Sequence, residues 1–144
     1  MSNTLYERDF HAWANQQAAL LRAGQLSDAD IENIAEEIES MGRSQRSELV
    51  NRLIVLLVHL MKWRWQPALR GASWRLTVKE QRRTLRRHLR DNPSLKPFQD
   101  SAIRDAYDSA QVATERETGL AADTFPDLCP FTFEQALADD FWPD

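Results

Sequence analysis

One histidine stands where a side chain could carry out acid–base chemistry. His59 lies within residues 53–61, the one stretch in which almost every residue is apolar. Burial disfavours the charged form of an imidazole, and an unpaired ring nitrogen inside a protein is costly, so the ring needs a partner. Two interpretations follow. His59 is a neutral core residue bonded to a neighbouring side chain or carbonyl, or it is a ligand or general base in an enzyme with a helical active site.

Acidic side chains supply the only candidates for binding a metal. Glu36 and Glu39, with Glu37 between them, could offer carboxylate oxygens. Helical di-iron proteins use inward carboxylates in this way, but they also carry Glu-x-x-His pairs, which this sequence lacks. In a continuous helix, His59 would lie about 30 to 35 Å from these carboxylates. A solvated or salt-bridged acidic face explains the same residues, so we expect no metal or other cofactor.

Motifs of the common hydrolases and nucleotide-binding enzymes are missing. The sequence has no Gly-x-Ser-x-Gly elbow, no phosphate-binding glycine loop and no His-Glu-x-x-His, and it contains only four glycines. The single cysteine, Cys129, excludes an internal disulfide and is better explained as a packed small hydrophobe than as a nucleophile. These observations favour a protein that is not an enzyme.

Basic and aromatic residues alternate in the middle of the chain. They occur as Trp63-Arg64-Trp65, Arg70 and Trp74-Arg75, and the following helix adds Arg82, Arg83, Arg86, Arg87 and His88. Stacking on tryptophan, combined with neutralisation of phosphates, is how single-stranded nucleic acid is held without sequence readout. We take Trp74, Arg82, Arg83, Arg86 and Arg87 as candidate nucleic-acid-binding residues. In the alternative, the tryptophans close one end of a bundle and the arginines pair with the acidic helices on either side.

The charge distribution bears on this choice. Residues 1–48 carry four basic and nine acidic side chains, residues 49–98 twelve and two, and residues 99–144 two and eleven. Such segments can pack side by side and neutralise one another, which predicts several Arg-to-carboxylate pairs between the basic helix and an acidic helix. The sequence pI of about 5.4 and the absence of a helix-turn-helix also disfavour nucleic-acid binding.

Helices are the elements that must position these residues. The apolar run at residues 53–61 has polar flanks without Gly or Pro until Pro67, which favours a helix over a buried strand. Its apolar residues cover more than one face, as in the central helix of a bundle. It is not a membrane span, because Arg52 and Lys62 are only ten positions apart and a bilayer requires about 20 apolar residues.

The expected fold is all-α. It is an antiparallel bundle of four main helices with a long or kinked second helix and a short C-terminal helix, forming one domain over residues 1–144. Caps and stops place the helices as follows: a first helix from Tyr6 to Arg22 with a stop at Gly24, a second capped by Ser27, a third from Ser73 to about Arg90, a fourth from Ser94 to Gly119, and a short one from Thr132 to about Ala138. The arginines of the third helix are expected to lie largely outward, and small alanines are expected on the packed face of the fourth. The buried stripe of the second helix is expected to be Ile31, Ile34, Ala35, Ile38 and Met41.

The length of the second helix links the fold to assembly. Without a break it would run from Asp28 to Trp65, about 57 Å, and would extend beyond a compact domain of this size. We favour a break or kink near Gly42, with Ser44 capping a restart. A break predicts a domain that can be monomeric. An unbroken helix predicts that its exposed apolar stripe is buried against a second copy, as a two-fold dimer.

The order of motifs resembles a known bacterial family. The motifs are Tyr6 to Asp9 with Trp13, Leu20-Leu21-Arg22-x-Gly24, Glu36-Glu37-Ile38-Glu39-x-Met41-Gly42, Leu56-Leu57-x-His59-Leu60-x-Lys62-Trp63, Ser73-Trp74-Arg75, Asn92-Pro93-Ser94-Leu95, Phe125-Pro126-x-x-Cys129-Pro130 and Phe141-Trp142-Pro143. They resemble the family known as domain of unknown function 29. The resemblance implies a small bacterial all-helical protein without an established activity, and it supplies no catalytic residues.

Three hypotheses for function therefore stand after the sequence. The leading one is a small non-catalytic interaction or oligomerisation module, with a protein partner or a second copy of itself. Nucleic-acid binding through the basic third helix is the second, and an enzyme with an active site around His59 is the third. The lone cysteine and the absence of an apolar leader within residues 1–22 favour a cytoplasmic protein that is not bound to a membrane.

Overall fold

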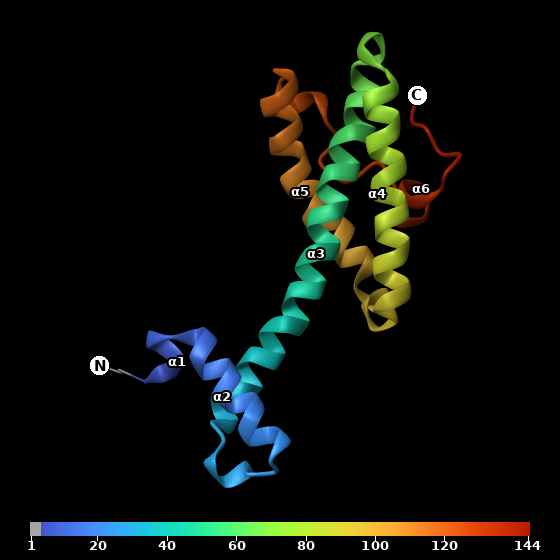
Figure 1. Ribbon diagram of the computed structural model, residues 1–144. Helices are drawn as coiled ribbons and strands as arrows, with labels where there is room; N and C mark the ends of the chain where they lie inside the picture. The colour runs from blue at the N-terminus through green and yellow to red at the C-terminus, as the bar shows by residue number, and fades with distance from the viewer. Residues whose placement is uncertain (1–3) are drawn as a thin grey trace. The chain divides into compact units, whose positions relative to one another are not determined.

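The regular secondary structure of the protein is all helical over the part of the chain that its computed structural model describes, residues 4–144 (Figure 1). Within this range there are six α-helices and four short 3₁₀ helices, and no strand. The chain forms two compact units, one up to Ser44 and one from Gln45 to Asp144. The expected all-α class is confirmed, and residues 1–3 of the expected domain lie outside the described range.

The first unit consists of short helix α1 (Leu5–Arg8), helix α2 (Phe10–Arg22), a 3₁₀ turn (Leu26–Asp28) and the beginning of helix α3. The expected first helix is interrupted at Asp9, whose carboxylate accepts a 3.1 Å bond from the amide of Ala12 and so caps α2. Gly24 follows α2 with a φ of +72°, a left-handed conformation that favours glycine. This glycine stop was predicted from the sequence.

Two side chains of α2, Trp13 and Gln17, form hydrogen bonds with Asp30, the residue immediately before α3. The indole nitrogen of Trp13 donates a 3.1 Å bond to the carboxylate of Asp30, and the amide of Asp30 donates a 2.7 Å bond to Oε1 of Gln17. Hydrogen bonds from the Asn33 side chain, the Trp13 indole and the Asn33 amide lower the pKa of the Asp30 carboxyl. The predicted cap Ser27 lies in the 3₁₀ turn, and α3 begins after Asp30.

The second unit contains the remainder of α3 (Ile31–Trp65), α4 (Ala72–Asp91), α5 (Gln99–Thr118) and α6 (Phe133–Leu137). In this unit α3, α4 and α5 follow one another in alternating directions, and α6 packs against α4 and α5 (Figure 1). The 3₁₀ helices in this unit are Pro67–Leu69, Pro93–Phe98 and Ala122–Thr124. Helix α6 begins with a capping box between Thr132 and Gln135, at the position where the sequence predicts the start of a short helix.

The hydrophobic core belongs to the second unit. The apolar run in α3 forms its centre, and the residues of α3 that are buried are Leu49, Leu53, Leu56, Leu57, Val58, Leu60 and Met61. Helix α4 adds Val78, Leu85 and Leu89 to the core, and α5 adds Ala102, Ile103, Ala106, Tyr107 and Ala110. The other buried members of the core are Leu95, Phe125, Phe131, Phe133 and Ala136. The small alanines of α5 line the packed face predicted for this helix.

Helix α3 continues through Gly42, so the break favoured from the sequence is wrong. Replacing alanine by glycine within a helix costs only about 1 kcal/mol, and one glycine cannot interrupt a helix of 35 residues that packing holds at both ends. Arg43 further supports this turn by pairing with Glu36 at 3.1 Å and Glu39 at 3.9 Å.

Two other predicted caps are also wrong. Helix α4 begins at Ala72 after Gly71, so Ser73 lies inside its first turn. Ser94 lies in the 3₁₀ helix Pro93–Phe98, and α5 begins only at Gln99. The end of α5 at Gly119, with a φ of +74°, agrees with the prediction.

Candidate interaction surfaces

His59 lies at the edge of the core instead of its centre. The residue is half-buried, and its Nδ1 hydrogen-bonds the main-chain oxygen of Val55, one helical turn earlier, at 2.8 Å. A backbone carbonyl is the type of partner expected for a structural histidine. Because the partner is a main-chain oxygen, this contact supplies no second catalytic side chain for the active site hypothesised around His59.

The acidic residues of α3 form ion pairs with an arginine. Glu36 and Glu39 are both exposed and both pair with Arg43, while Glu37 accepts a hydrogen bond from the hydroxyl of Tyr6. Among residues 4–144 no group of three or more His, Cys, Asp and Glu side chains could hold a metal ion. The salt-bridged acidic face predicted as the alternative is the arrangement that the structure contains.

Cys129 is a packed thiol in the second unit. It is half-buried against the core, and its sulfur donates a hydrogen bond of 3.3 Å to the carbonyl of Phe131. Burial raises the pKa of the Cys129 thiol, which keeps it protonated and weakly nucleophilic.

An apolar groove runs between α2 and α3 in the first unit. It has a volume of about 430 Å³, and its lining comprises Phe10, Trp13, Ala14, Gln17, Ala18 and Leu21 of α2 and Ile34, Glu37, Ile38 and Met41 of α3. We call this surface the apolar groove. Ile38 is 63% exposed and Met41 is 67% exposed, and Ile31 near the groove is also exposed. Of the stripe predicted to be buried, only Ile34 is half-buried, and its other four residues are exposed.

Spacing along α3 shows what kind of surface this is. Ile31 and Ile38 are seven residues apart, as are Ile34 and Met41. Along the helix, successive members of this series are therefore three, four and three residues apart. This is the spacing of the a and d positions in two heptads of a coiled coil. The face is therefore shaped to pack against another helix.

Two arginines of α4 face the C-terminal segment, contrary to their predicted outward position. Arg82 is 1% exposed, and its guanidinium donates to the carbonyls of Ala136 at 2.8 Å, Asp139 at 3.4 Å and Phe141 at 2.7 Å. Burial lowers the pKa of the Arg82 guanidinium, and the nearby carboxylate of Asp139 partly compensates for this effect. Arg86 donates to the carbonyl of Leu137 at 3.0 Å and pairs with Asp139. Arg82 is thus an internal anchor.

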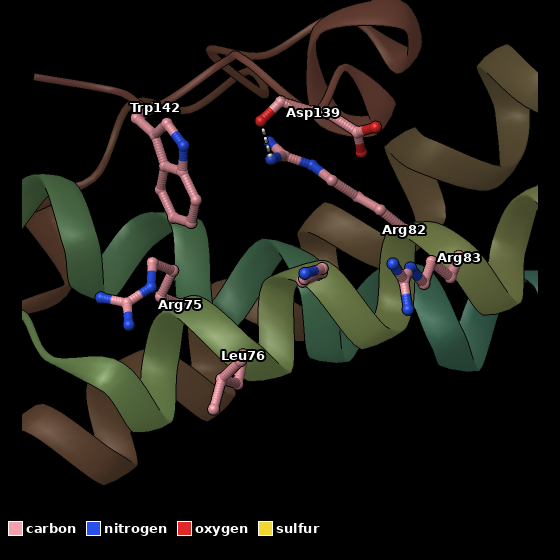
Figure 2. Close-up of a pocket in the computed structure, with 7 residues that line it drawn as sticks. Arg75, Leu76, Arg82, Arg83, Asp139 and Trp142 are labelled. Carbon is pink, nitrogen blue, oxygen red and sulfur yellow. Dashed lines mark hydrogen bonds between the residues drawn. The ribbon is translucent and has the colours of Figure 1, made fainter.

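Four other cations of α4 form a row on its outward face. Arg75, Lys79, Arg83 and Arg87 are exposed and follow one another at intervals of four residues. We call these four residues the cationic row. Figure 2 shows Arg75 and Arg83 along one side of α4, with Arg82 and Trp142 on the side of the C-terminal segment. Arg75, Lys79 and Arg83 line a hollow of about 460 Å³ together with Trp142 and Asp139.

No side chain of this row has an ion-pair or hydrogen-bond partner among the described residues. Within the same range, the ion pairs of α4 join Arg86 to Asp139 and Arg90 to Asp91, and none reaches α2 or α5. The predicted pairing of these arginines with acidic helices is therefore wrong. Like charges four residues apart destabilise a helix by about 0.2–0.5 kcal/mol per pair, so the row does not serve the stability of α4.

Trp74 is the aromatic residue that the sequence predicts for this surface, but the structure places Trp142 there. Trp74 is half-buried, with the Lys62 ammonium 5.7 Å from its ring centre, and does not line the hollow. Trp142 does, and its ring centre lies 4.4 Å from that of Trp63 and 5.3 Å from the Arg82 guanidinium carbon. Lys79 was also missed as a candidate, although the four-residue spacing of the row is visible in the sequence.

The described residues define an all-α protein with an uncovered apolar groove on one unit and a row of unpaired cations on the other. The chain belongs to the family described as Domain of unknown function DUF29, which it matches over residues 5–142. No curated protein and no solved structure matches it. Within residues 4–144, none of the helices combines the length and the apolar character that crossing a bilayer demands.

Proposed function

We propose that this protein is a small non-catalytic oligomerisation module of the bacterial cytoplasm, and that its first unit pairs with a second copy through the apolar groove. The observation that carries the proposal is the exposure of three of the four heptad residues of α3, which are Ile31, Ile38 and Met41. It rests on three further features of the first unit: its lack of a core, the symmetry of its apolar face and the charges at the two ends of that face.

The first unit cannot bury a core on its own. Among its described residues up to Ser44, only Trp13 and Gln17 are buried, and one of these is polar. Units of about 40 residues generally need disulfides, metals or association to become stable. With the sole cysteine in the second unit, association with further helices is the route that these residues support.

A second copy supplies helices of the right kind. If two α3 helices pack antiparallel about an axis between Ile34 and Ile38, Ile34 of each copy faces Ile38 of the other, and Ile31 faces Met41. We call the line of contact between these paired residues the seam. The two α2 helices then cover the sides of the seam, and Phe10 and Leu21 become buried. Four helices packed in this way form an antiparallel bundle, which is a common and stable architecture.

The charges at the ends of the seam agree with this arrangement. In an antiparallel pair about the same axis, Arg43 of one copy lies level with Asp28 and Asp30 of the other. The contact is repeated by symmetry, so each dimer gains two sets of opposite charges. A parallel pair would instead place identical charges next to each other, which disfavours that orientation.

The proposal is tested by the mass in solution of the wild type and of two matched variants. We expect the wild type to have twice the 16.7 kDa chain mass at micromolar concentration by light scattering. Ile38→Asp places a charge in the middle of the seam and should give a monomer. Val112→Asp makes the same type of change at a 55% exposed position of α5 and should leave the dimer intact.

Circular dichroism checks that Ile38→Asp keeps its helices, because this residue is exposed in the single chain and its replacement should not unfold it. A wild type that stays monomeric at micromolar concentration would overturn the proposal. So would a dimer that resists Ile38→Asp, or one that dissociates equally in Val112→Asp.

A further inference from the structure

We propose that the cationic row of α4 binds single-stranded nucleic acid, with phosphates along Arg75, Lys79, Arg83 and Arg87 and a base against Trp142. The row lies in the second unit, so the proposal does not rest on dimer formation through the first. It is argued from the spacing of the cations, their lack of internal partners and the shape of the surface.

The spacing of the row suits a linear polyanion. Residues four apart on a helix are separated by about 6 Å along its axis, so the four cations extend over about 18 Å in single file. An isolated anion would engage one or two of them. A chain with a regularly repeated negative charge can engage all four.

The cations are available for a ligand. Arg82 and Arg86 are committed to the carbonyls of the C-terminal segment, and Asp139, the one acidic residue of the hollow, is paired with Arg86. Arg75 and Arg83 lie along α4 and take no part in the contacts that Arg82 makes with the C-terminal segment (Figure 2). Folding therefore uses some cations of α4 and leaves others facing solvent.

The surface offers space for a flat apolar group beside the cations. The hollow of about 460 Å³ contains the indole of Trp142 and the exposed side chain of Leu76. A second hollow of about 480 Å³ is lined by Leu76, Lys79, Glu80, Arg83, Thr84 and Arg87. The two hollows share three residues, so they form one continuous surface along α4.

This combination favours a nucleic-acid strand over an acidic peptide. Each nucleotide presents one phosphate and one base, and bases stack on aromatic side chains without regard to sequence. An acidic peptide brings the charges but has a flat ring only where its sequence includes an aromatic residue. With no reader motif in the sequence, binding should be independent of base order and governed by salt.

The test is the binding of labelled single-stranded DNA and RNA oligonucleotides to the full chain, measured by fluorescence anisotropy at 50 and 200 mM salt. Four phosphate contacts on a single strand predict an affinity that falls about 50-fold between these concentrations. The double variant Lys79→Gln/Arg83→Gln should bind more weakly and lose only about 7-fold, because two contacts remain. The matched control Arg104→Gln/Arg116→Gln removes two exposed arginines of α5 and should behave as the wild type.

Three outcomes would overturn the proposal. One is the absence of binding at 50 mM salt. Another is an equal loss of affinity in the control double variant, which would show attraction to net charge alone. The third is competition by a poly-glutamate peptide as effective as that of the unlabelled oligonucleotide, which would point to an acidic protein partner instead. Circular dichroism and thermal unfolding confirm that both double variants are folded.

Discussion

The guanidinium Nη2 of Arg82 donates a hydrogen bond of 2.7 Å to the main-chain oxygen of Phe141, 59 residues further along the chain. Nε and Nη1 of the same side chain reach the carbonyls of Ala136 and Asp139. One buried cation thus holds a loop of backbone that contains no regular structure after α6. Its charge is compensated mainly by carbonyl dipoles instead of by a paired carboxylate.

Replacing this arginine should destabilise the second unit. Arg82→Met keeps much of the apolar volume but leaves three carbonyls without their donor, and we expect a loss of about 3 kcal/mol or more in the free energy of unfolding. Its neighbour Arg83 is exposed, so Arg83→Met should stay within about 0.5 kcal/mol of the wild type. Urea denaturation of the two variants makes the comparison. Equal effects would contradict the anchoring role of Arg82.

Both tyrosines of the chain should lose their phenolic protons at a higher pH than an unperturbed tyrosine does. The hydrogen bond to Glu37 raises the pKa of Tyr6 to about 12, and burial raises the pKa of Tyr107 to about 12. The hydroxyl of Tyr107 also donates a 2.6 Å bond to the carbonyl of Pro126. Because these values lie above the ordinary 10.0, the folded state holds both protons more tightly than the unfolded state.

The resulting stabilisation is complete below pH 10 and is lost as the pH rises towards 12. Phenolate absorbance of the native protein should therefore rise near pH 12, whereas the protein in denaturant should titrate near 10. Tyr6→Phe leaves Tyr107 as the only source of the signal. A native midpoint near 10 for this variant would show that the Tyr107 hydroxyl is not held as described.

Two glycines should respond in opposite directions to the same substitution. Neither Gly42 nor Gly119 has an atom within 4 Å of the position where a Cβ would stand. Gly42 lies inside α3, so Gly42→Ala should stabilise the protein by about 0.5–1 kcal/mol. Gly119 has a φ of +74°, so Gly119→Ala should destabilise it by about 1–2 kcal/mol. Thermal unfolding would reveal the difference, and the same sign for both would contradict the assignment of their backbone conformations.

The sequence was sufficient to predict the elements whose signals are local. The density of apolar residues around Leu56 identified the centre of the core, and the short helix expected from Thr132 is α6, whose N-cap is Thr132. Capping and stop signals at Gly24 and Gly119 were also reliable, because a left-handed residue fixes the end of a helix by itself.

Features that depend on contacts between distant parts of the chain could not be predicted from the sequence. Periodicity showed that Ile31, Ile34 and Ile38 share one face of a helix, but it cannot show whether anything in the same chain covers that face. Arg82 and Arg83 are likewise adjacent in a basic run, and only one is buried. The difference arises from carbonyls more than fifty residues away, whose position no local pattern records.

The residues to which Arg82 donates hydrogen bonds are synthesised well after Arg82 itself. Ala136, Asp139 and Phe141 follow Arg82 by 54, 57 and 59 residues. At a translation rate of about 5–20 residues per second, the ribosome adds them about 3 to 12 s after Arg82. During this interval α4 can form, but its buried cation has only water as a partner. Completion of the second unit is therefore delayed until the C-terminal segment leaves the exit tunnel, and a nascent chain that ends before Ala136 exposes this part of the core.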